Sequence, residues 1–357
     1  MKRAMTLMTL IVLAASVPSL AASSLDSIDP LIESHLGILG GGASIAIVQN
    51  GKVILRRHYG TFADETVVPI ASASKWISAA VIMSVVDEGK LSLDDRVIKY
   101  IPSFSGDKSS ITIRQLLSHT SGLPADSGLR SSGCLSDRFT TLAACAGEIA
   151  AGPLIAAPGT EFNYGGLSMQ VAGRVAEIVE AKPWEEIFQQ RIARPLALTT
   201  MTYGSSANPF IAGSVRSSLD DYVRFLQMIL NRGVVNGRTI LSAASVDEMQ
   251  KDQTRGAAIG FTPYEKYGYL DAGLPSTRYG LGEWRERVDA TGRAVEVSSQ
   301  GAFGFSPWID KERMLVGVLM LRSSLIQVMP VYLDLKQIVR TAIAPVPTTR
   351  RRAVVRH

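Results

Sequence analysis

The chain contains few metal-binding residues and no concentrated patch of charge. It has two cysteines and four histidines in 357 residues, and their spacing matches no common metal-ligand arrangement, so we predict no metal and no other cofactor. Charged residues make up 19% of the chain, and the net charge is +5. The basic residues are not clustered as densely as in a typical nucleic-acid-binding face. The motif Gly-x-Ser-x-Gly is also absent, which excludes the nucleophile turn of the α/β-hydrolases.

The N-terminus has the pattern of a secretory signal peptide. Lys2 and Arg3 precede an apolar run at residues 5–15, and Ala21 completes a small-x-small cleavage pattern. The run is too short for a comfortable transmembrane span, and no cysteine near the cleavage site would accept a lipid anchor. Removal of residues 1–21 would reduce the net charge to +3 (5 − 2). We therefore expect export to the periplasm or the medium, without a stable membrane anchor after cleavage.

Export bears on the two cysteines, Cys134 and Cys145. In an oxidising compartment, two cysteines this close in sequence can form a disulfide that closes a small loop. The alternative is a pair of buried thiols, and the sequence leaves both open.

Strand patterns occur at both ends of the chain, and helical patterns fill the middle. Asn50-Gly51 between residues 43–49 and 52–59 predicts a hairpin, because this dipeptide accepts positive φ at both turn positions. Further strands are expected at 279–287, 294–299, 303–309 and 314–322. Helices are expected at 25–36, 72–88, 113–117, 139–151, 168–181, 184–193, 219–231, 242–251 and 328–342.

This order of elements predicts an α/β (α+β) fold. Strands so far apart in sequence most simply join one antiparallel sheet flanked by helices, with the helical block inserted as a separate lobe. Since 46% of the residues are hydrophobic, a large core is expected. We assign residues 22–345 to one domain, with a sheet lobe at about 25–88 and 252–345 and a helical lobe at about 89–251. The basic tail 346–357 is interpreted as a solvated end.

The pair Ser72 and Lys75 carries the strongest chemical signal. Residues three apart at the start of a helix share one face, so the two side chains can hydrogen-bond. A serine hydroxyl becomes a nucleophile when a neighbouring base takes its proton, and a lysine can serve when its surroundings favour the neutral form. Another Ser-x-x-Lys occurs at Ser105 and Lys108, but it lies in a Gly/Asp-rich loop without an apolar helix behind it.

Four stretches in a fixed order resemble the serine β-lactamase-related family. This family contains class C β-lactamases, penicillin-binding D-alanyl-D-alanine peptidases and esterases of the same fold. The matching stretches are Ser72-x-x-Lys75, Leu116-Leu117-Ser118-His119-Thr120-Ser121-Gly122-Leu123-Pro124, Pro158-Gly159-Thr160-x-Phe162-x-Tyr164 and Gly301-Ala302-Phe303-Gly304. The resemblance covers roughly residues 25–343 and implies a β-lactamase/D,D-peptidase-like fold.

The resemblance also implies a role for each matching residue. Ser72 would attack an acyl carbon, Lys75 would accept its proton, and Tyr164 would pass protons to the leaving group and later activate water. The backbone N–H groups of Ser72 and Ala302 would form the oxyanion hole, with Ala302 following an edge strand. His119 matches a structural turn and is not assigned to catalysis.

Two departures from the family pattern bear on the substrate. The asparagine of the family's Tyr-x-Asn motif is replaced by Gly166, and the third motif, usually Lys-Thr-Gly or His-x-Gly, is Ser299-Gln300-Gly301. We assign Gly166, Ser299, Gln300 and Gly301 to substrate binding. In relatives the asparagine positions the substrate amide and the lysine adds positive charge near its carboxylate, so both losses favour a neutral or weakly polar ester.

Three hypotheses follow from these residues. The first is an exported serine hydrolase that cleaves small acyl esters through an acyl-enzyme on Ser72. The second is a cell-wall D,D-peptidase or weak β-lactamase that acts on a peptide-like substrate with the same site. The third is a non-catalytic binding protein on the same scaffold, which the altered motifs support and the intact set of Ser72, Lys75 and Tyr164 opposes.

Overall fold

The computed structural model describes residues 24–125, 133–264 and 278–347. The expected signal peptide, much of the loop at 125–135, half of the connection at 252–276 and most of the basic tail lie outside these residues. Within the described ranges, no helix has both the length and the apolar character needed to cross a membrane.

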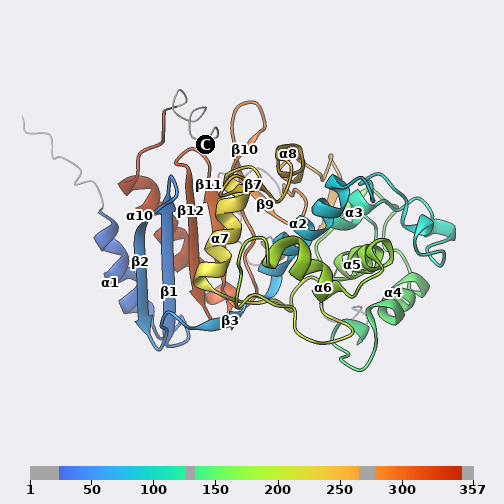
Figure 1. The fold of residues 1–357 in the computed structure, drawn as a ribbon. Helices are drawn as coiled ribbons and strands as arrows, with labels where there is room; N and C mark the ends of the chain where they lie inside the picture. Colours follow the sequence, from blue (N-terminus) through green and yellow to red (C-terminus); the bar gives the residue numbers. More distant parts are fainter. Residues whose placement is uncertain (1–23, 126–132, 265–277, 348–357) are drawn as a thin grey trace, which may run out of the picture.

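A six-stranded antiparallel sheet forms one side of the molecule, and both ends of the chain contribute to it (Figure 1). Its spatial order is β2 (Lys52–Gly60), β1 (Gly42–Gln49), β12 (Leu315–Leu321), β11 (Ser306–Asp310), β10 (Ala294–Ser298) and β9 (Trp284–Val288). The register places Ile45 opposite Leu319 across the junction of the two chain ends. The predicted fold class and the hairpin at Asn50-Gly51 are confirmed.

Helices cover both faces of the sheet (Figure 1). The helix α7 (Leu219–Leu230) packs on one face, and α1 (Ile28–His35) and α10 (Leu325–Ala342) cover the other. Ile45 belongs to the hydrophobic cluster under α1 and α10, and Ala46 belongs to the cluster that includes α7. Alternate residues of a strand point to opposite faces, so burial of both faces explains the continuous apolar run in β1.

The remaining helices build the lobe beside the sheet, and α2 (Ser74–Asp87) lies between the two parts (Figure 1). They are α3 (Ile113–Leu117), α4 (Leu142–Ala151), α5 (Leu167–Glu180), α6 (Trp184–Phe188) with its π-helical extension Gln189–Ala193, and α8 (Ala243–Met249). Thr112 begins α3 with a capping box, as its hydroxyl accepts from the backbone of Gln115. Cys134 and Cys145 form a disulfide, which decides the alternative that the sequence left open.

Three short strand pairs complete the fold. They are β3 (Val67–Pro69) with β5 (Arg216–Ser218), β4 (Glu161–Asn163) with β8 (Ala258–Phe261), and β6 (Val234–Val235) with β7 (Arg238–Thr239). The parallel pair of β4 and β8 was not expected, because residues 252–276 show little periodicity in sequence.

Some expected boundaries differ from the structure for reasons visible in the backbone. The strand expected at 279–287 begins only at Trp284, because Gly282 adopts φ +79° in the turn before it. The strand expected at 303–309 begins at Ser306, after a tight turn in which Gly304 adopts φ +86°. The range predicted for the helical lobe also contains α7, which lies against the sheet.

The buried carboxyl group of Glu283 leads to a prediction about stability against pH. Burial raises the pKa of Glu283 to about 8, although the charges of Lys311 and Arg285 oppose the rise. A carboxyl whose folded-state pKa lies above its unfolded value stabilises fully below about pH 4.5, and its contribution is lost as the pH rises toward 8. The wild type should therefore lose stability relative to Glu283→Gln as the pH rises from about 5 to 7.5, by about 3 kcal/mol.

Thermal melts of both proteins across this pH range measure the effect. Glu186→Gln, a substitution of an exposed glutamate, serves as the control and should run parallel to the wild type. Parallel curves for Glu283→Gln and the wild type would contradict the prediction.

Candidate active site

Ser72 lies in a 3-10 turn, Ala71–Ala73, that leads directly into α2. The preceding residue, Ala71, has φ +46°, in the left-handed region that alanine rarely occupies. The surroundings hold this turn in place: the Tyr222 hydroxyl donates to the carbonyl of Ala73 at 2.8 Å, and the backbone N–H of Val215 donates to Ser74 Oγ at 3.2 Å. Strained backbone of this kind persists where packing imposes it and is concentrated at functional sites.

Lys75 approaches Ser72 as the spacing predicts. Its Nζ lies 3.0 Å from Ser72 Oγ and 3.3 Å from the carbonyl oxygen of Ala212, and only 2% of the residue is exposed. A nucleophile and a base at this separation are within reach for direct proton transfer. In the other Ser-x-x-Lys, Lys108 forms an ion pair with Asp107 at 3.4 Å.

Tyr164 reaches the same place from the helical lobe. It follows β4 directly, and its backbone N–H donates to Phe261 of β8 at 3.0 Å. Its ring centroid lies 4.6 Å from Lys75 Nζ. The structure thus brings Tyr164 beside Ser72 and Lys75, although Tyr164 lies far from both in the chain.

His119 is a neighbour of this set that the sequence assigned only to a turn. Its φ of +58° fits the turn, and its carbonyl accepts from the N–H of Asn163, the residue before Tyr164, at 2.8 Å. Its ring centroid lies 4.8 Å from that of Tyr164. Burial, and then the charge of Lys75, lower the pKa of His119 well below its usual value, so the ring adds no positive charge beside the lysine. No sequence pattern reveals this contact.

Aromatic side chains surround the ring of Tyr164. Trp284 of β9 lies 4.9 Å from it between centroids, and Tyr279 lies 5.9 Å away at a steep angle. Tyr264 packs edge-on against Trp284 at 4.6 Å. These contacts fix the plane of the Tyr164 ring and therefore the position of its hydroxyl.

The third motif runs alongside the turn that carries Ser72. Ser299 Oγ lies 3.3 Å from each of the carbonyl oxygens of Ser72 and Gly282. A Cβ atom on Gly301 would lie 2.0 Å from the carbonyl oxygen of Ile70, so only glycine allows this approach. Ala302 follows in an exposed turn between β10 and β11. Since β10 pairs with both β9 and β11, the expectation of an edge strand before Ala302 is wrong.

Two residues predicted to bind substrate are placed differently. Gln300 is 3% exposed, and its side-chain amide contacts Glu286, Ser298 and Tyr264 instead of the Ser72 side of the segment. The reason is the alternation of an extended segment, which turns Ser299 toward Ser72 and Gln300 to the opposite face. Gly166 is the N-cap residue of α5, two residues beyond Tyr164, and as a glycine it has no side chain to offer a substrate.

The chain is similar in sequence to known proteins of one family. The family described as Beta-lactamase matches residues 37–326. Protein flp of Staphylococcus aureus (strain N315) is 31% identical over 203 residues, which cover 53% of this chain and 40% of that protein. Penicillin-binding protein 4 of Amycolatopsis lactamdurans is 26% identical over 334 residues, which cover 78% of this chain and 85% of the relative. The match therefore spans less than half of the length of Protein flp.

Solved structures share the whole fold. A structure from Bacteroides dorei DSM 17855 with a provisional beta-lactamase name superposes with a TM-score of 0.80 at 38% identity, covering 90% of this chain and 99% of that one. EstCE1, described as a hydrolase with promiscuous acyltransferase activity, has a TM-score of 0.73 at 20% identity, covering 90% and 100%. At this lower identity the likeness concerns the fold alone.

Proposed function

The chain belongs to the beta-lactamase family of serine hydrolases, and from this premise we propose that it cleaves small acyl esters through an acyl-enzyme on Ser72. The observation that carries the proposal is the contact of Lys75 Nζ with Ser72 Oγ at 3.0 Å, beside the ring of Tyr164. A nucleophile, a base and a second proton carrier are thus in one place, as acyl transfer requires.

In the acylation step, Ser72 Oγ attacks the ester carbonyl carbon while its proton passes to Lys75. The tetrahedral intermediate then collapses, the ester C–O bond breaks, and Tyr164 delivers a proton to the departing alkoxide. In the second step a water molecule, deprotonated through Tyr164, attacks the acyl-enzyme and releases the carboxylic acid. Ser72 recovers its proton from Lys75, so the enzyme returns to its starting state.

The negative charge of the intermediate needs donors that are in place before reaction. The backbone N–H groups of Ser72 and Ala302 serve as these donors in the proposal, and the close approach of Gly301 to Ile70 holds their two segments side by side. A single donor of this kind typically contributes about 3–4 kcal/mol to the transition state.

The preference for an ester over a β-lactam or peptide rests on the altered motifs. Ser299 occupies the place of the motif lysine, and its hydroxyl faces backbone carbonyls, so it brings no positive charge toward a substrate carboxylate. Gly166 replaces the asparagine that would bind a substrate amide, and glycine has no side-chain donor. A neutral ester requires neither group.

A second candidate is a D,D-peptidase or weak β-lactamase with the same site. The similarity to Penicillin-binding protein 4 over 78% of this chain favours it. In either case we propose that the protein acts in the periplasm or the medium. The disulfide between Cys134 and Cys145 supports this location, because such bonds persist in oxidising compartments.

Hydrolysis of p-nitrophenyl acetate and butyrate, measured beside nitrocefin and fluorescent penicillin labelling, tests the proposal. We expect kcat/KM for the esters to exceed that for nitrocefin by about a hundredfold, the size of effect that two lost polar contacts produce. Comparable nitrocefin turnover or rapid penicillin labelling would move the protein to the second candidate. Absence of labelling by a fluorophosphonate would instead favour a non-catalytic binding protein.

A further inference from the structure

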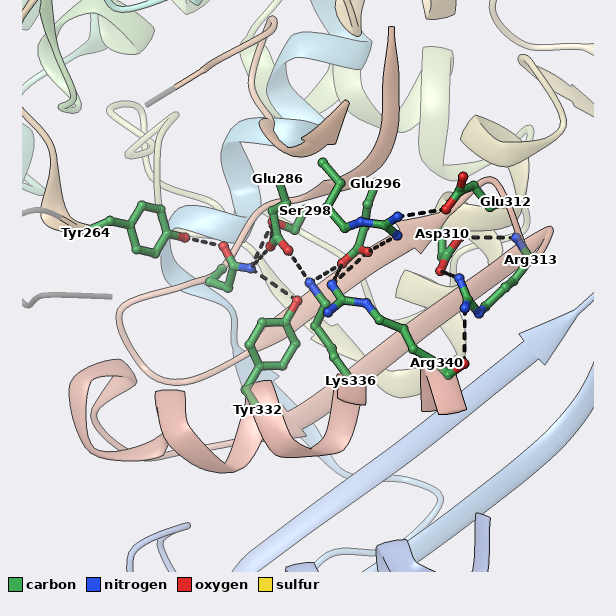
Figure 2. Close-up of polar contacts among 12 residues, drawn as sticks. Tyr264, Glu286, Glu296, Ser298, Asp310, Glu312, Arg313, Tyr332, Lys336 and Arg340 are labelled. Carbon is green, nitrogen blue, oxygen red and sulfur yellow. Dashed lines mark hydrogen bonds and ion pairs between the residues drawn. The ribbon is translucent and has the colours of Figure 1, made fainter. Parts of the chain in front are cut away.

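A network of charged side chains, most of them buried, joins α10 to Glu286 and Glu296 (Figure 2). The side chain of Gln300, in the third motif, contacts this network through Glu286. Lys336 of α10 has a side chain that is 1% exposed, and its Nζ contacts both Glu286 of β9 and Glu296 of β10. Arg340, one turn further along α10, donates to both carboxylate oxygens of Glu296 at 2.8 Å. Ion pairs between side chains thus connect α10 with β9 and β10, on the face of the sheet opposite to α7.

Such a network needs an explanation beyond stability. Burial alone would raise the pKa of Glu296, yet the charges of Lys336 and Arg340 lower it to about 2. The carboxylate is therefore ionised in the interior. Desolvation of buried ions offsets most of their attraction, so an apolar cluster of the same size would stabilise the fold at least as well. The feature that the ions add is a defined geometry, since each hydrogen bond has a direction.

The network ends on the side-chain amide of Gln300. The Nε2 atom lies 2.7 Å from Glu286 Oε1 and 3.2 Å from the Tyr332 hydroxyl, and the Oε1 atom accepts from the Tyr264 hydroxyl. Burial raises the pKa of Tyr264 well above its usual value, so the phenol stays protonated and donates. Both ends of the amide are occupied, and the side chain of Gln300 has one orientation.

The same helix holds the segment beyond Gln300. The N–H of Leu325, at the start of α10, donates to the carbonyl of Ala302 at 3.0 Å, and the N–H of Ser323 donates to Phe303 at 2.9 Å. α10 therefore contacts residues 300–302 at two separate points, the side chain of Gln300 through Tyr332 and the carbonyl of Ala302 through Leu325. The peptide plane that carries the Ala302 N–H lies between them.

We infer that Glu286 and Lys336 are positioning residues that act through Gln300 to aim the Ala302 N–H at the oxyanion. In this arrangement Gln300 orients the segment and does not touch substrate. The inference rests on the proposed function, because the oxyanion belongs to that reaction. It replaces the sequence-based assignment of Gln300 to substrate binding.

Two near-isosteric variants, Glu286→Gln and Gln300→Met, test the inference. Each weakens the contact between the network and the segment, so we expect kcat for p-nitrophenyl butyrate to fall about tenfold with KM within about twofold of the wild-type value. Butane-1-boronic acid, which forms a tetrahedral adduct with an active serine, should bind about tenfold more weakly to both variants. The double variant should lose no more than either single one, because both act on one element.

Asp310→Asn is the matched control. It disturbs the ion pair of Asp310 with Arg313 at 2.9 Å, which is about as buried as the pair of Lys336 with Glu286. Arg313 also contacts α10, at the carbonyl of Arg340, and within the described residues the ion pair contacts no atom of Gln300. This variant should alter the melting temperature and leave kcat unchanged.

Equal losses of kcat in the control and the two test variants would assign the network a structural role and overturn the inference. So would a rise in KM at unchanged kcat, which would make Gln300 a substrate contact. If the wild type hydrolyses no ester, the proposed function fails and the boronic acid comparison alone decides the inference. Should Glu286→Gln not fold, Gln300→Met carries the test, since it introduces no unpaired charge.

Discussion

Replacing Ser72 by alanine is expected to lower kcat/KM for p-nitrophenyl butyrate by at least about 10³–10⁴-fold, because no acyl-enzyme can form. The variant lacks Ser72 Oγ, the atom that lies 3.0 Å from Lys75 Nζ and forms the acyl bond in the proposed mechanism. The fold should survive, because Ser72 is partly exposed and the 3-10 turn is anchored through the backbone of Ala73 and the hydroxyl of Ser74.

The chain offers a matched control for this variant. Ser105→Ala alters the other Ser-x-x-Lys sequence at an exposed position, and activity should remain at the wild-type level. Intact-mass measurement after fluorophosphonate treatment should show one adduct on the wild type and on Ser105→Ala, and none on Ser72→Ala. Ester turnover that survives in Ser72→Ala would remove Ser72 from the mechanism.

Replacing Lys75 by methionine is expected to lower kcat/KM by about a thousandfold. Methionine fills much of the same buried volume, so the loss reports the missing proton acceptor more than a change in packing. Lys75→Arg should be equally inactive, because a guanidinium cannot give up its proton at any pH at which the protein is folded. The pair of variants therefore separates a need for a base from a need for positive charge.

The rate of fluorophosphonate labelling measures this step directly, because it depends on deprotonation of Ser72. Lys108→Met in the other Ser-x-x-Lys should label at the wild-type rate. An active Lys75→Arg enzyme would show that the lysine acts only through its charge, and the assignment of Lys75 as the base would then be wrong.

Features that depend on neighbouring residues could be predicted from the sequence. Asn50-Gly51 produced the expected hairpin because both turn positions accept positive φ, and Thr112 capped the expected helix because its hydroxyl reaches the third residue beyond it. The contact of Ser72 with Lys75 belongs to the same class. Their spacing of three places both side chains on one turn, whatever the rest of the chain does.

Other parts of the candidate site could be inferred only through the family resemblance. Tyr164 has no local signal that separates it from a core aromatic residue, and the motif around it identified it before its ring was found 4.6 Å from Lys75 Nζ. The ring contact of His119 with Tyr164 was not predicted, because a turn already accounts for the motif that contains His119. Its contact with Tyr164 requires two loops to meet, and neither loop specifies the other in sequence.

The sequence by itself therefore determined the helical turn that pairs Ser72 with Lys75, the hairpin, and the chain order of the main-sheet strands and the longer helices. Only the tertiary structure decided what surrounds that turn. Ser299 contacts the carbonyl of Ser72, which is 227 residues away in the chain. The direction of the Gln300 side chain depends on its contact with the charged side chains of β9, β10 and α10. The physical reason is range: local geometry follows from bond rotations and short hydrogen bonds, whereas contacts between distant segments depend on how all the strands and helices pack together.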